Sequence, residues 1–518
     1  MQPQSTAPLI ESILAACTKS PELADTERRT LETVVVVNNG TSTLKQTDGG
    51  LKLWDYDDLL RSNKGEDFPL QTQLQPQDTI NLQFTSGTTS APKAVELSHW
   101  NILSNAQVHG YCFNTTEEER MVCTMPLYHC GGIVAVLLSA MTYGASINLP
   151  CESFDALLTL RALKEDRATI IHGVPTMFLA WIDLLSKPEF ADHNWSHLKT
   201  GLLGAAPILP SFRKTLNDRF HLHDLSNCYG MTELSPMASQ TRPFDPEEQK
   251  YFTVGRPVPH QTVRIAARDN PHQTLRVGEK GEIVVAGMVM KGYWEDPERT
   301  ADAICVTTDE DGKKTRWMRT GDEGVMDAEG FLKVTGRIKD MIIRGGENIY
   351  PDEIENALMQ CPGVKRVSVV GLPDDRYGEV VAAFVIPDCG THTFPTCEGD
   401  ASAIDVRQHT IQADAAKATV QSSKKRKLPV EDDSPRKTRK TTTKDAPAVR
   451  SDGDAAPALN AELLRAWVRA RLSRHLVPKY VFWIDELPMT PTGKIEKFNL
   501  RALGRQVLEV PKKKETLR

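Results

Sequence analysis

The chain has 518 residues, of which 40% are hydrophobic, so it can bury more than one core and exceeds the usual size of a single domain. With 62 basic and 68 acidic residues the net charge is −6, which excludes a general electrostatic attraction to nucleic acid or to a membrane surface. The sequence therefore predicts a multidomain globular protein.

The spacing of the cysteines and the length of the most apolar segment indicate the cellular compartment of the protein. The ten cysteines are scattered without a C-x-x-C pair, and a chain of this length folds without disulfides, which favours a reducing environment. The most apolar run, residues 132–145, is shorter than the roughly 20 residues of a membrane-spanning helix and is interpreted as a core helix. We therefore expect a cytoplasmic protein without a membrane span, with the peroxisome or the nucleus as alternatives.

The first predicted elements lead into a polar loop. A β-branched run at residues 34–37 predicts a buried strand, and residues 79–84 predict a second strand that runs into the loop TSGTTSAPK, after which a helix begins at Ser98. Small side chains, hydroxyls and one lysine suit a loop that wraps an oligophosphate, although a Ser/Thr-rich surface turn fits the composition equally well. The candidate phosphate-binding residues are Thr85, Ser86, Gly87, Thr88, Thr89 and Lys93.

Helical and strand patterns alternate after this loop. Residues 101–109 predict a helix, residues 120–125 and 169–172 predict strands, and residues 173–178 begin another helix. Such alternation is typical of α/β layers with mostly parallel strands, which bind ligands at the loops beyond the strand carboxyl ends. His129, in the segment PLYHCGG, is a candidate catalytic residue in such a loop, although a lone histidine is more often structural.

Two further loops contain candidate ligand contacts. In NCYGMTE, an aromatic ring, a hydroxyl and a carboxylate within five residues could supply a stacking face, a phosphate donor and an oxygen ligand for Mg²⁺. The same letters also fit an ordinary turn. The candidates are Tyr229, Thr232 and Glu233, together with Gly204, Ala205 and Ala206 of the preceding segment GLLGAAP.

The following segment predicts a loop, a hairpin and a small α+β domain. Asp322 suits a ribose diol and Arg337 suits a nucleotide, with a surface ion pair as the alternative. Beyond Lys339, residues 341–349 predict a strand that ends in the glycine turn of Gly345 and Gly346. A helix with acidic residues in its first turn follows at 351–358, as the helix dipole favours, and strands are predicted at 367–371 and 380–386.

Residues 388–458 interrupt this pattern. They contain few aromatic residues and no hydrophobic periodicity, so they predict a disordered insertion. Two basic runs, at 424–427 and 436–440, flank the acidic residues 431–433 and resemble a bipartite nuclear-localisation signal, although a solvated charge run and a retained intron are alternatives. An amphipathic helix is predicted at 461–472, and Lys494 follows in the segment LPMTPTGKIEK.

Six of these elements resemble, in the same order, motifs of the adenylate-forming superfamily, which includes acyl-CoA synthetases, luciferases and the adenylation domains of peptide synthetases. The family patterns are T-S-G-T-T-G-x-P-K-G, P-L-F-H-x-x-G, Y-G-x-T-E, T-G-D, G-R-x-K-D and P-x-T-x-x-G-K-I. Ser90 and Ala94 depart from the first pattern, where glycine is usual. The segments PLYHCGG and GVPTMF are most similar to the medium-chain fatty acyl-CoA synthetase branch.

The resemblance implies a large multi-layer α/β domain at 1–338 and a small, mobile α+β domain at 339–518, with Lys339 at the hinge. It implies that the protein uses ATP and Mg²⁺ to activate a carboxylic acid, expected to be a fatty acid, as an acyl-adenylate. It also implies that coenzyme A accepts the acyl group. Lys494 would be the mobile catalytic lysine, and Glu233 the metal ligand. Thr232 would contact the α-phosphate, and His129 would lie against the carboxylate.

The remaining roles also follow from the resemblance. Residues 85–93 would bind the pyrophosphate, Tyr229 and the strand end at Gly204, Ala205 and Ala206 would enclose adenine, and Asp322 and Arg337 would bind the ribose and phosphate. Gly345 and Gly346 would face the site during thioester formation. The family normally has a longer segment before the phosphate loop, so we expect an incomplete large domain. A catalytically impaired nuclear interaction protein is the alternative function.

Overall fold

The computed structural model describes residues 33–36, 52–55, 73–85, 93–204, 210–222, 224–388, 400, 402–407, 459–490 and 495–509. The chain divides into two units, Met1–Leu74 and Gln75–Arg518. In the first unit, β1 (Thr33–Val36) pairs in parallel with β2 (Lys52–Asp55), which confirms the strand predicted at this position.

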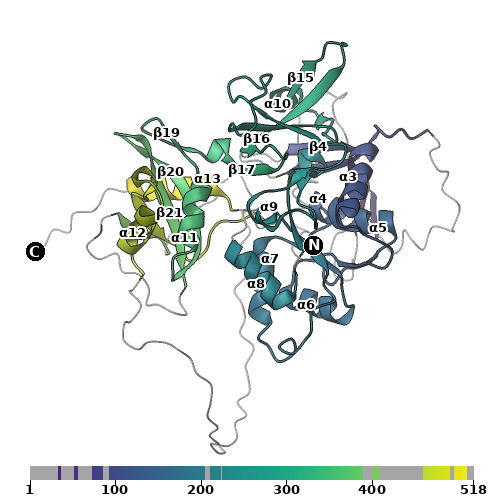
Figure 1. The fold of residues 1–518 in the computed structure, drawn as a ribbon, viewed down its shortest axis with the longest axis horizontal. Helices are drawn as coiled ribbons and strands as arrows, with labels where there is room; N and C mark the ends of the chain where they lie inside the picture. The colour runs from purple at the N-terminus through teal and green to yellow at the C-terminus, as the bar shows by residue number, and fades with distance from the viewer. Residues whose placement is uncertain are drawn as a thin grey trace, which may run out of the picture. The chain divides into compact units, whose positions relative to one another are not determined.

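The largest sheet among the described residues of the second unit has seven strands, and the fold is drawn in Figure 1. Four neighbouring pairs among β6, β5, β7, β8 and β9 are parallel, and β10 and β11 continue the sheet antiparallel to β9. The predicted α/β architecture is therefore confirmed. The strands are β5 (Arg120–Val122), β6 (Ser146–Asn148), β7 (Ile170–Gly173), β8 (Thr200–Gly204), β9 (Asp224–Gly230), β10 (Met237–Gln240) and β11 (Arg256–Pro257).

Alternating strand residues build a core on each face of this sheet. Ile171 and Leu203 pack with Phe178 and Trp181 beneath α6 (Ala156–Glu165), α7 (Pro175–Leu184) and α8 (Pro210–Phe220). Their neighbours Ile170 and Leu202 face the other way. That second face packs against α3 (His99–Cys112), α4 (Cys130–Gly132), the π-helix η1 (Ile133–Leu138) and α5 (Ser139–Tyr143), which together include the predicted core helix. Because strand side chains alternate in direction, both faces of a central strand can be apolar.

A three-stranded antiparallel sheet corrects one prediction. β3 (Thr79–Thr85) pairs with β4 (Lys93–Ser98), and β14 (Gly292–Tyr293) pairs with the other edge of β4. The predicted order of strand, loop and helix was incomplete, because β4 lies between the loop and α3. The six residues of β4 are too short for a clear alternating pattern. On β3, Ile80, Leu82 and Phe84 share one face and are exposed.

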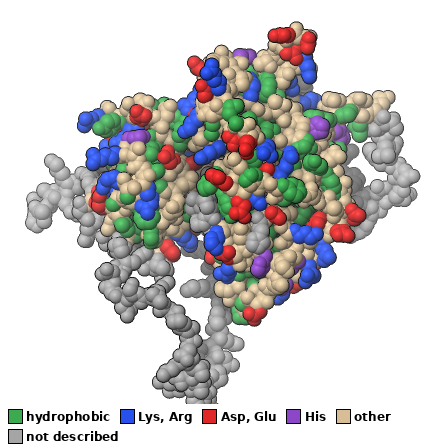
Figure 2. Space-filling view, viewed as in Figure 1, with side chains coloured by type: hydrophobic (Ala, Val, Ile, Leu, Met, Phe, Trp, Pro, Cys, Tyr) green, Lys and Arg blue, Asp and Glu red, His purple; other side chains and the backbone are tan. Residues whose placement is uncertain are grey.

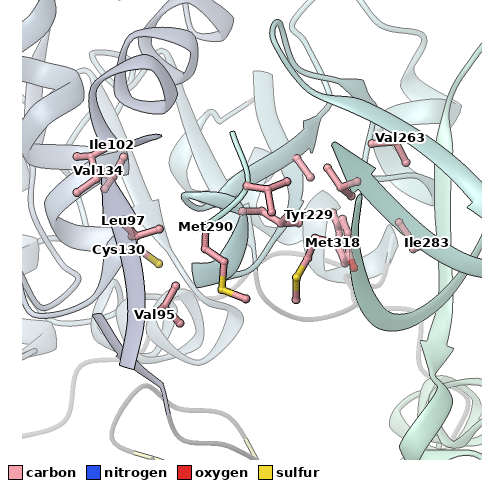
Figure 3. Close-up of a cluster of buried hydrophobic side chains, with 14 of the residues drawn as sticks. Val95, Leu97, Ile102, Cys130, Val134, Tyr229, Val263, Ile283, Met290 and Met318 are labelled. Atoms are coloured by element: carbon pink, nitrogen blue, oxygen red, sulfur yellow. The ribbon is translucent and has the colours of Figure 1, made fainter. Parts of the chain in front are cut away.

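A five-stranded sheet follows, composed of β12 (Thr262–Ala266), β13 (Gly281–Ala286), β15 (Ile304–Thr308), β16 (Lys314–Met326) and β17 (Leu332–Arg337). Its inner side chains join those of β4 and α3 in one buried cluster. In Figure 3, Tyr229 and Met290 lie between Val95 and Ile102 on one side and Val263 and Ile283 on the other. The three sheets of the large domain therefore share a core.

The carboxyl-terminal part forms a separate α+β domain, as predicted. Its sheet contains β18 (Ile342–Arg344), β19 (Glu347–Ile349), β20 (Val364–Asp374), β21 (Gly378–Pro387), β22 (Ala403–Asp405) and β23 (Tyr480–Trp483). One face packs against α11 (Pro351–Met359) and α12 (Ala461–Arg471), and the other against α13 (Lys497–Glu509).

Strand β22 lies inside the segment that was predicted to be an insertion. It pairs in parallel with β23, Ala403 and Val406 are buried, and Asp400 forms an ion pair with Arg465 at 2.5 Å. Residues 402–407 therefore belong to the domain core, and the predicted boundaries of 388–458 were too wide. A strand of three residues gives too little hydrophobic periodicity to be recognised. The basic runs at 424–427 and 436–440 lie outside the described residues.

We expect that deletion of residues 408–458, bridged by a short Gly-Ser linker, leaves the thermal unfolding midpoint nearly unchanged, because loop length has only a small logarithmic cost. Extending the deletion to residue 400 should lower the free energy of unfolding by about 2 to 4 kcal/mol, since it removes buried side chains and leaves Arg465 without its carboxylate. Thermal and urea denaturation of both variants measure the difference. Equal losses of free energy of unfolding in the two variants would contradict the placement of the start of the insertion after residue 407.

A buried histidine pair joins α3 to β7. Nε2 of His109 lies 2.9 Å from Nε2 of His172, and both side chains are 1% exposed. Burial lowers the pKa of His172 to about 4 and lowers the pKa of His109 as well, with a further contribution from the neighbouring ring. The pair is therefore neutral at physiological pH, with one ring donating to the other.

The depressed pKa values predict a loss of stability in acid. The unfolded histidine takes up its proton near pH 6.5, and folded His172 only near pH 4, so the stabilisation is complete above pH 6.5 and decreases as the pH falls toward 4. Between pH 7 and pH 4.5 the double variant His109→Leu/His172→Phe should lose less free energy of unfolding than the parent, by about 2 to 3 kcal/mol for each histidine removed. Urea denaturation across this range measures the slope, with exposed His272→Gln as the control. If the free energy of unfolding depended on pH equally in the parent, the double variant and the control, the assignment of the acid-induced loss to the histidine pair would be contradicted.

On the face shown in Figure 2, Lys and Arg side chains lie among Asp and Glu side chains over most of the described surface. This distribution agrees with the small net charge of −6. Among the described residues, no helix has both the length and the apolar character needed to cross a membrane.

Candidate active site

The turn after β9 carries two of the predicted functional side chains. Thr232 and Glu233 lie in the 3₁₀ helix η2 (Thr232–Leu234) beyond the carboxyl end of β9, and both are buried. A Cβ atom at Gly230 would lie 1.9 Å from the carbonyl oxygen of Pro236, so only glycine allows this turn to close. The turn that carries Thr232 and Glu233 is therefore tightly closed at the end of β9.

Two buried amides fix the same turn from different elements. Nδ2 of Asn105, on α3, donates to the carbonyl of Met237 at 3.0 Å. Nε2 of Gln261, beside β12, donates to the carbonyls of Leu234 and Met237 at 3.1 and 3.0 Å. Met290 N–H donates to the carbonyl of Glu233 at 2.9 Å. Because buried carbonyls need partners, these groups hold the backbone of η2 without using the Glu233 carboxylate.

The Glu233 carboxylate lies beside the lysine that ends the predicted phosphate loop. The hydroxyl of Tyr293 donates to Oε1 of Glu233 at 2.9 Å, and Nζ of Lys93 lies 4.6 Å from the centre of the Tyr293 ring. Partial burial lowers the pKa of Lys93, Glu233 raises it, and the positive charges of Lys339 and Arg299 lower it further. Lys93 is therefore close enough to interact with two carboxylates, Glu233 and Asp296, and with two other cations, of which Arg299 is paired with Asp296 at 3.3 Å. Such a group of charges suits a metal-bound oligophosphate.

The ends of the predicted phosphate loop are placed by the β3–β4 hairpin. Thr85, the last residue of β3, is the register partner of Lys93, the first residue of β4. Ser86, Gly87, Thr88 and Thr89 lie outside the described residues. The side chain of Gln83 donates to the carbonyl of Tyr128, which joins β3 to the segment that contains His129. The described ends of the hairpin therefore lie in paired strands, of which β3 is bonded to the segment before His129.

A second group joins the predicted adenine and ribose contacts. The Tyr229 hydroxyl, at the end of β9, donates to Oδ2 of Asp322 at 2.7 Å. Nε of Arg337 lies 3.4 Å from Oδ1 of Asp322, and the two residues are direct partners in the β16–β17 register. Burial and the neighbouring carboxylate raise the pKa of Tyr229, so its hydroxyl stays protonated. The structure thus brings together three residues from distant parts of the sequence.

His129 caps the short helix α4. Its Nδ1 accepts a hydrogen bond from Gly131 N–H at 2.9 Å, which leaves Nε2 as the protonated nitrogen of the neutral ring. The next residue, Cys130, places its Sγ 3.5 Å from Oγ1 of Thr232. A Cβ atom at Gly132 would lie 2.3 Å from the carbonyl of Pro126, so a larger residue would displace this segment. His129 and Thr232 therefore lie on neighbouring turns of one edge.

The other predicted residues are placed less completely. Gly204 ends β8 at the same sheet edge, while Ala205, Ala206 and Lys494 lie outside the described residues. Lys339 lies in the 3₁₀ helix η3 (Ile338–Asp340), directly after β17. Gly345 and Gly346 form the β18–β19 turn with φ values of 58° and 90°, and Gly345 N–H donates to the carbonyl of Tyr377 inside the carboxyl-terminal domain. That turn is not part of the Glu233 cluster.

Three residues of the site were absent from the sequence predictions: Asn105, Gln261 and Tyr293. Asn101 and Asn105 are four residues apart on one face of an otherwise apolar helix pattern, which is a signal for buried polar contacts. Gln261 and Tyr293 have no comparable local signal, because their partners are distant in sequence.

Comparison with known proteins identifies the family. The pattern of the AMP-binding enzyme family matches residues 8–294, and that of the AMP-binding enzyme C-terminal domain matches residues 353–418. Acyl-CoA ligase sidI of Aspergillus fumigatus is 35% identical over 446 residues, covering 85% of this chain and 63% of the relative. Medium-chain acyl-CoA ligase ACSF2 of Homo sapiens, named as mitochondrial, is 32% identical over 502 residues, covering 95% of this chain and 67% of the relative.

Solved structures have the same fold. o-Succinylbenzoate CoA synthetase from Bacillus subtilis, in complex with its acyl-adenylate intermediate, has a TM-score of 0.63 at 25% identity and covers 87% of this chain and 74% of that one. ATP-bound MatB from Rhodopseudomonas palustris has a TM-score of 0.63 at 24% identity, covering 84% and 70%. The chain spans 63% of the length of the first two curated relatives. From the match to residues 8–294 and the identity to these relatives, the chain belongs to the AMP-binding enzyme family.

Proposed function

We propose that the chain is an acid–thiol ligase that activates a carboxylic acid with ATP and transfers the acyl group to coenzyme A. The single observation that carries this proposal is the proximity of Lys93, Tyr293 and Glu233 at the sheet edge. The names of the ligase relatives and the acyl-adenylate bound in o-succinylbenzoate CoA synthetase support the same reaction.

The chemistry follows from the low reactivity of a carboxylate. In the first step a carboxylate oxygen attacks the α-phosphorus of ATP, the bond to the β-phosphate oxygen breaks, and pyrophosphate leaves. Lys93 and residues 85–89 would bind the departing phosphates, Thr232 would donate to the α-phosphate, and Lys494 would bridge the two reacting groups. These contacts contribute orientation and electrostatic stabilisation. In the second step the thiol of coenzyme A attacks the acyl carbonyl, loses its proton and releases AMP.

The residues present fit a magnesium ion that arrives with the nucleotide. Magnesium usually binds one or two carboxylates together with substrate phosphates, and the buried Glu233 supplies one carboxylate at the required edge. Within the described ranges, no group of three or more His, Cys, Asp or Glu side chains could hold a metal ion. When bound, the ion would neutralise phosphate charge during pyrophosphate departure.

Nucleotide contacts complete the proposal. Tyr229 would stack on adenine, and Asp322 would accept from the ribose hydroxyls while Arg337 balances its charge. Lys339 would be the hinge that brings Gly345 and Gly346 to the site for the second step. We propose a fatty acid as the substrate class and the cytoplasm as the compartment.

Acid-dependent pyrophosphate release tests the function. The chain is incubated with ATP, Mg²⁺ and single acids that range from acetate to long-chain fatty acids and include hydroxy and aromatic acids. Products with coenzyme A are separated by chromatography. We expect pyrophosphate, AMP and a thioester with at least one fatty acid. Thioester formation with only polar or aromatic acids would overturn the substrate class, and ADP formation or acid-independent hydrolysis would overturn the reaction.

A further inference from the structure

Tyr293 is fixed to the strand that begins at Lys93. In β14 it is the direct register partner of Val95, and Gly292 is the partner of Glu96. The next residue, Trp294, donates its N–H to the carbonyl of Ala94 at 2.8 Å. The Tyr293 backbone is therefore paired with the first residues of β4, directly after Lys93.

The side chain of Tyr293 contacts both charges of the cluster. Its hydroxyl donates to Oε1 of Glu233, and its ring face lies under the ammonium group of Lys93. The residue is only 6% exposed, so water competes little with either contact. A carboxylate oxygen and an ammonium group are both attracted to tyrosine, but to different parts of it: the hydroxyl proton and the negative ring face.

The two charged groups contact different parts of the tyrosine and not each other. Lys93 and Glu233 interact electrostatically, yet among the described residues no ion pair joins them. A direct lysine–carboxylate pair would occupy the oxygen needed by a metal ion and the ammonium group needed by a phosphate. Tyr293 instead gives each of the two charges a contact of its own.

We propose that Tyr293 is a positioning residue, which orients the Glu233 carboxylate toward Mg²⁺ and prevents Lys93 from closing onto it. This inference rests on the proposed function for the identity of the metal–nucleotide ligand. It assigns two separable tasks to one side chain: the hydroxyl orients the carboxylate, and the ring holds the lysine.

Two variants separate these tasks. Tyr293→Phe removes the hydroxyl and keeps the ring, whereas Tyr293→Leu removes both. Tyr143→Phe is the matched control, because the Tyr143 hydroxyl donates to the carbonyl of Gln107 at 2.8 Å on α3, on a different part of the domain. Isothermal calorimetry with ATP, with and without Mg²⁺, measures binding independently of turnover. The Mg²⁺ dependence of acid-dependent ATP–pyrophosphate exchange is measured in parallel.

Tyr293→Phe should raise the Mg²⁺ concentration for half-maximal exchange about ten-fold, because a hydrogen bond to a charged group is lost, and should leave ATP binding without Mg²⁺ nearly unchanged. Tyr293→Leu should in addition weaken ATP binding without Mg²⁺ about ten-fold, because Lys93 is free to pair with Glu233. If Tyr293→Leu does not fold, Tyr293→Met, which also lacks the ring, replaces it; unchanged ATP binding without Mg²⁺ in the variant that lacks the ring would overturn the second task.

The outcomes distinguish this inference from the proposed function. An active parent with an unchanged Mg²⁺ dependence in Tyr293→Phe would overturn the positioning role and leave the function standing. A parent that binds MgATP without acid-dependent exchange would overturn the function, and calorimetry of the variants would still decide the role of Tyr293. A parent that binds no ATP would overturn both. A Mg²⁺ shift in Tyr143→Phe equal to that in Tyr293→Phe would show a general effect of hydroxyl loss and also contradict the role.

Discussion

Replacement of Lys494 with alanine is expected to reduce acyl-adenylate formation by about a hundred- to a thousand-fold, the range found when one preorganised electrostatic donor is removed. The lysine lies outside the described residues, and the expectation rests on its place in PTGK beyond the hinge. Its charge would stabilise the transition state only while the carboxylate approaches the α-phosphate. The measurement is acid-dependent ATP–pyrophosphate exchange by the purified variant.

The second half-reaction is the internal control for this variant. When acyl-adenylate is supplied directly, thioester formation by Lys494→Ala should stay within a few-fold of the parent. Equal losses in the two half-reactions would contradict the assignment of the lysine to the first step alone.

Glu233→Gln is expected to lower the rate of adenylate formation by about a hundred-fold and to raise the Mg²⁺ requirement, because the neutral amide is a poor ligand for a hard cation. The fold should persist. A glutamine oxygen can still accept from the Tyr293 hydroxyl, and the turn is held through backbone carbonyls by Asn105 and Gln261. Steady-state kinetics over a range of Mg²⁺ concentrations provide the measurement, together with the thermal unfolding midpoint.

Glu119→Gln is the matched control for loss of a buried carboxylate. Glu119 forms an ion pair with Lys199 at 2.7 Å just before β5, at the opposite end of the strand from the site loops. It should change stability and leave the Mg²⁺ dependence unaltered. A Mg²⁺ shift of the same size in both variants would contradict a specific role for Glu233.

The sequence predicted the parts of the fold that are encoded locally. The strands β7, β20 and β21 contain continuous apolar runs, the helices α3, α11 and α12 are longer patterned segments, and each forms where it was expected. Short strands such as β4 and β22 were missed because they contain too few residues to show a recognisable pattern. β22 gains its place from pairing with β23, across an interval of more than seventy residues that includes most of the predicted insertion.

The site was predictable only where one segment carries several functional side chains. YGMTE, TGD and the GR segment resemble family motifs, and the roles proposed for their residues follow from that resemblance, because the segments alone also fit a turn or a surface ion pair. The contacts that position these groups could not be predicted, because each joins distant segments: Asn105 to Met237, Gln261 to Leu234, and Tyr293 to Glu233. A single tyrosine or amide in a chain gives no indication of a partner that tertiary packing places beside it.

Oxygen transfer from the acid tests the central claim most directly. A substrate acid labelled with ¹⁸O in its carboxylate is converted to the thioester, and the AMP that is released is examined by mass spectrometry. If a carboxylate oxygen attacks the α-phosphorus, one labelled oxygen remains on the phosphate of AMP after the thiol of coenzyme A displaces it. Unlabelled AMP, or label found in inorganic phosphate together with ADP, would contradict activation through an acyl-adenylate.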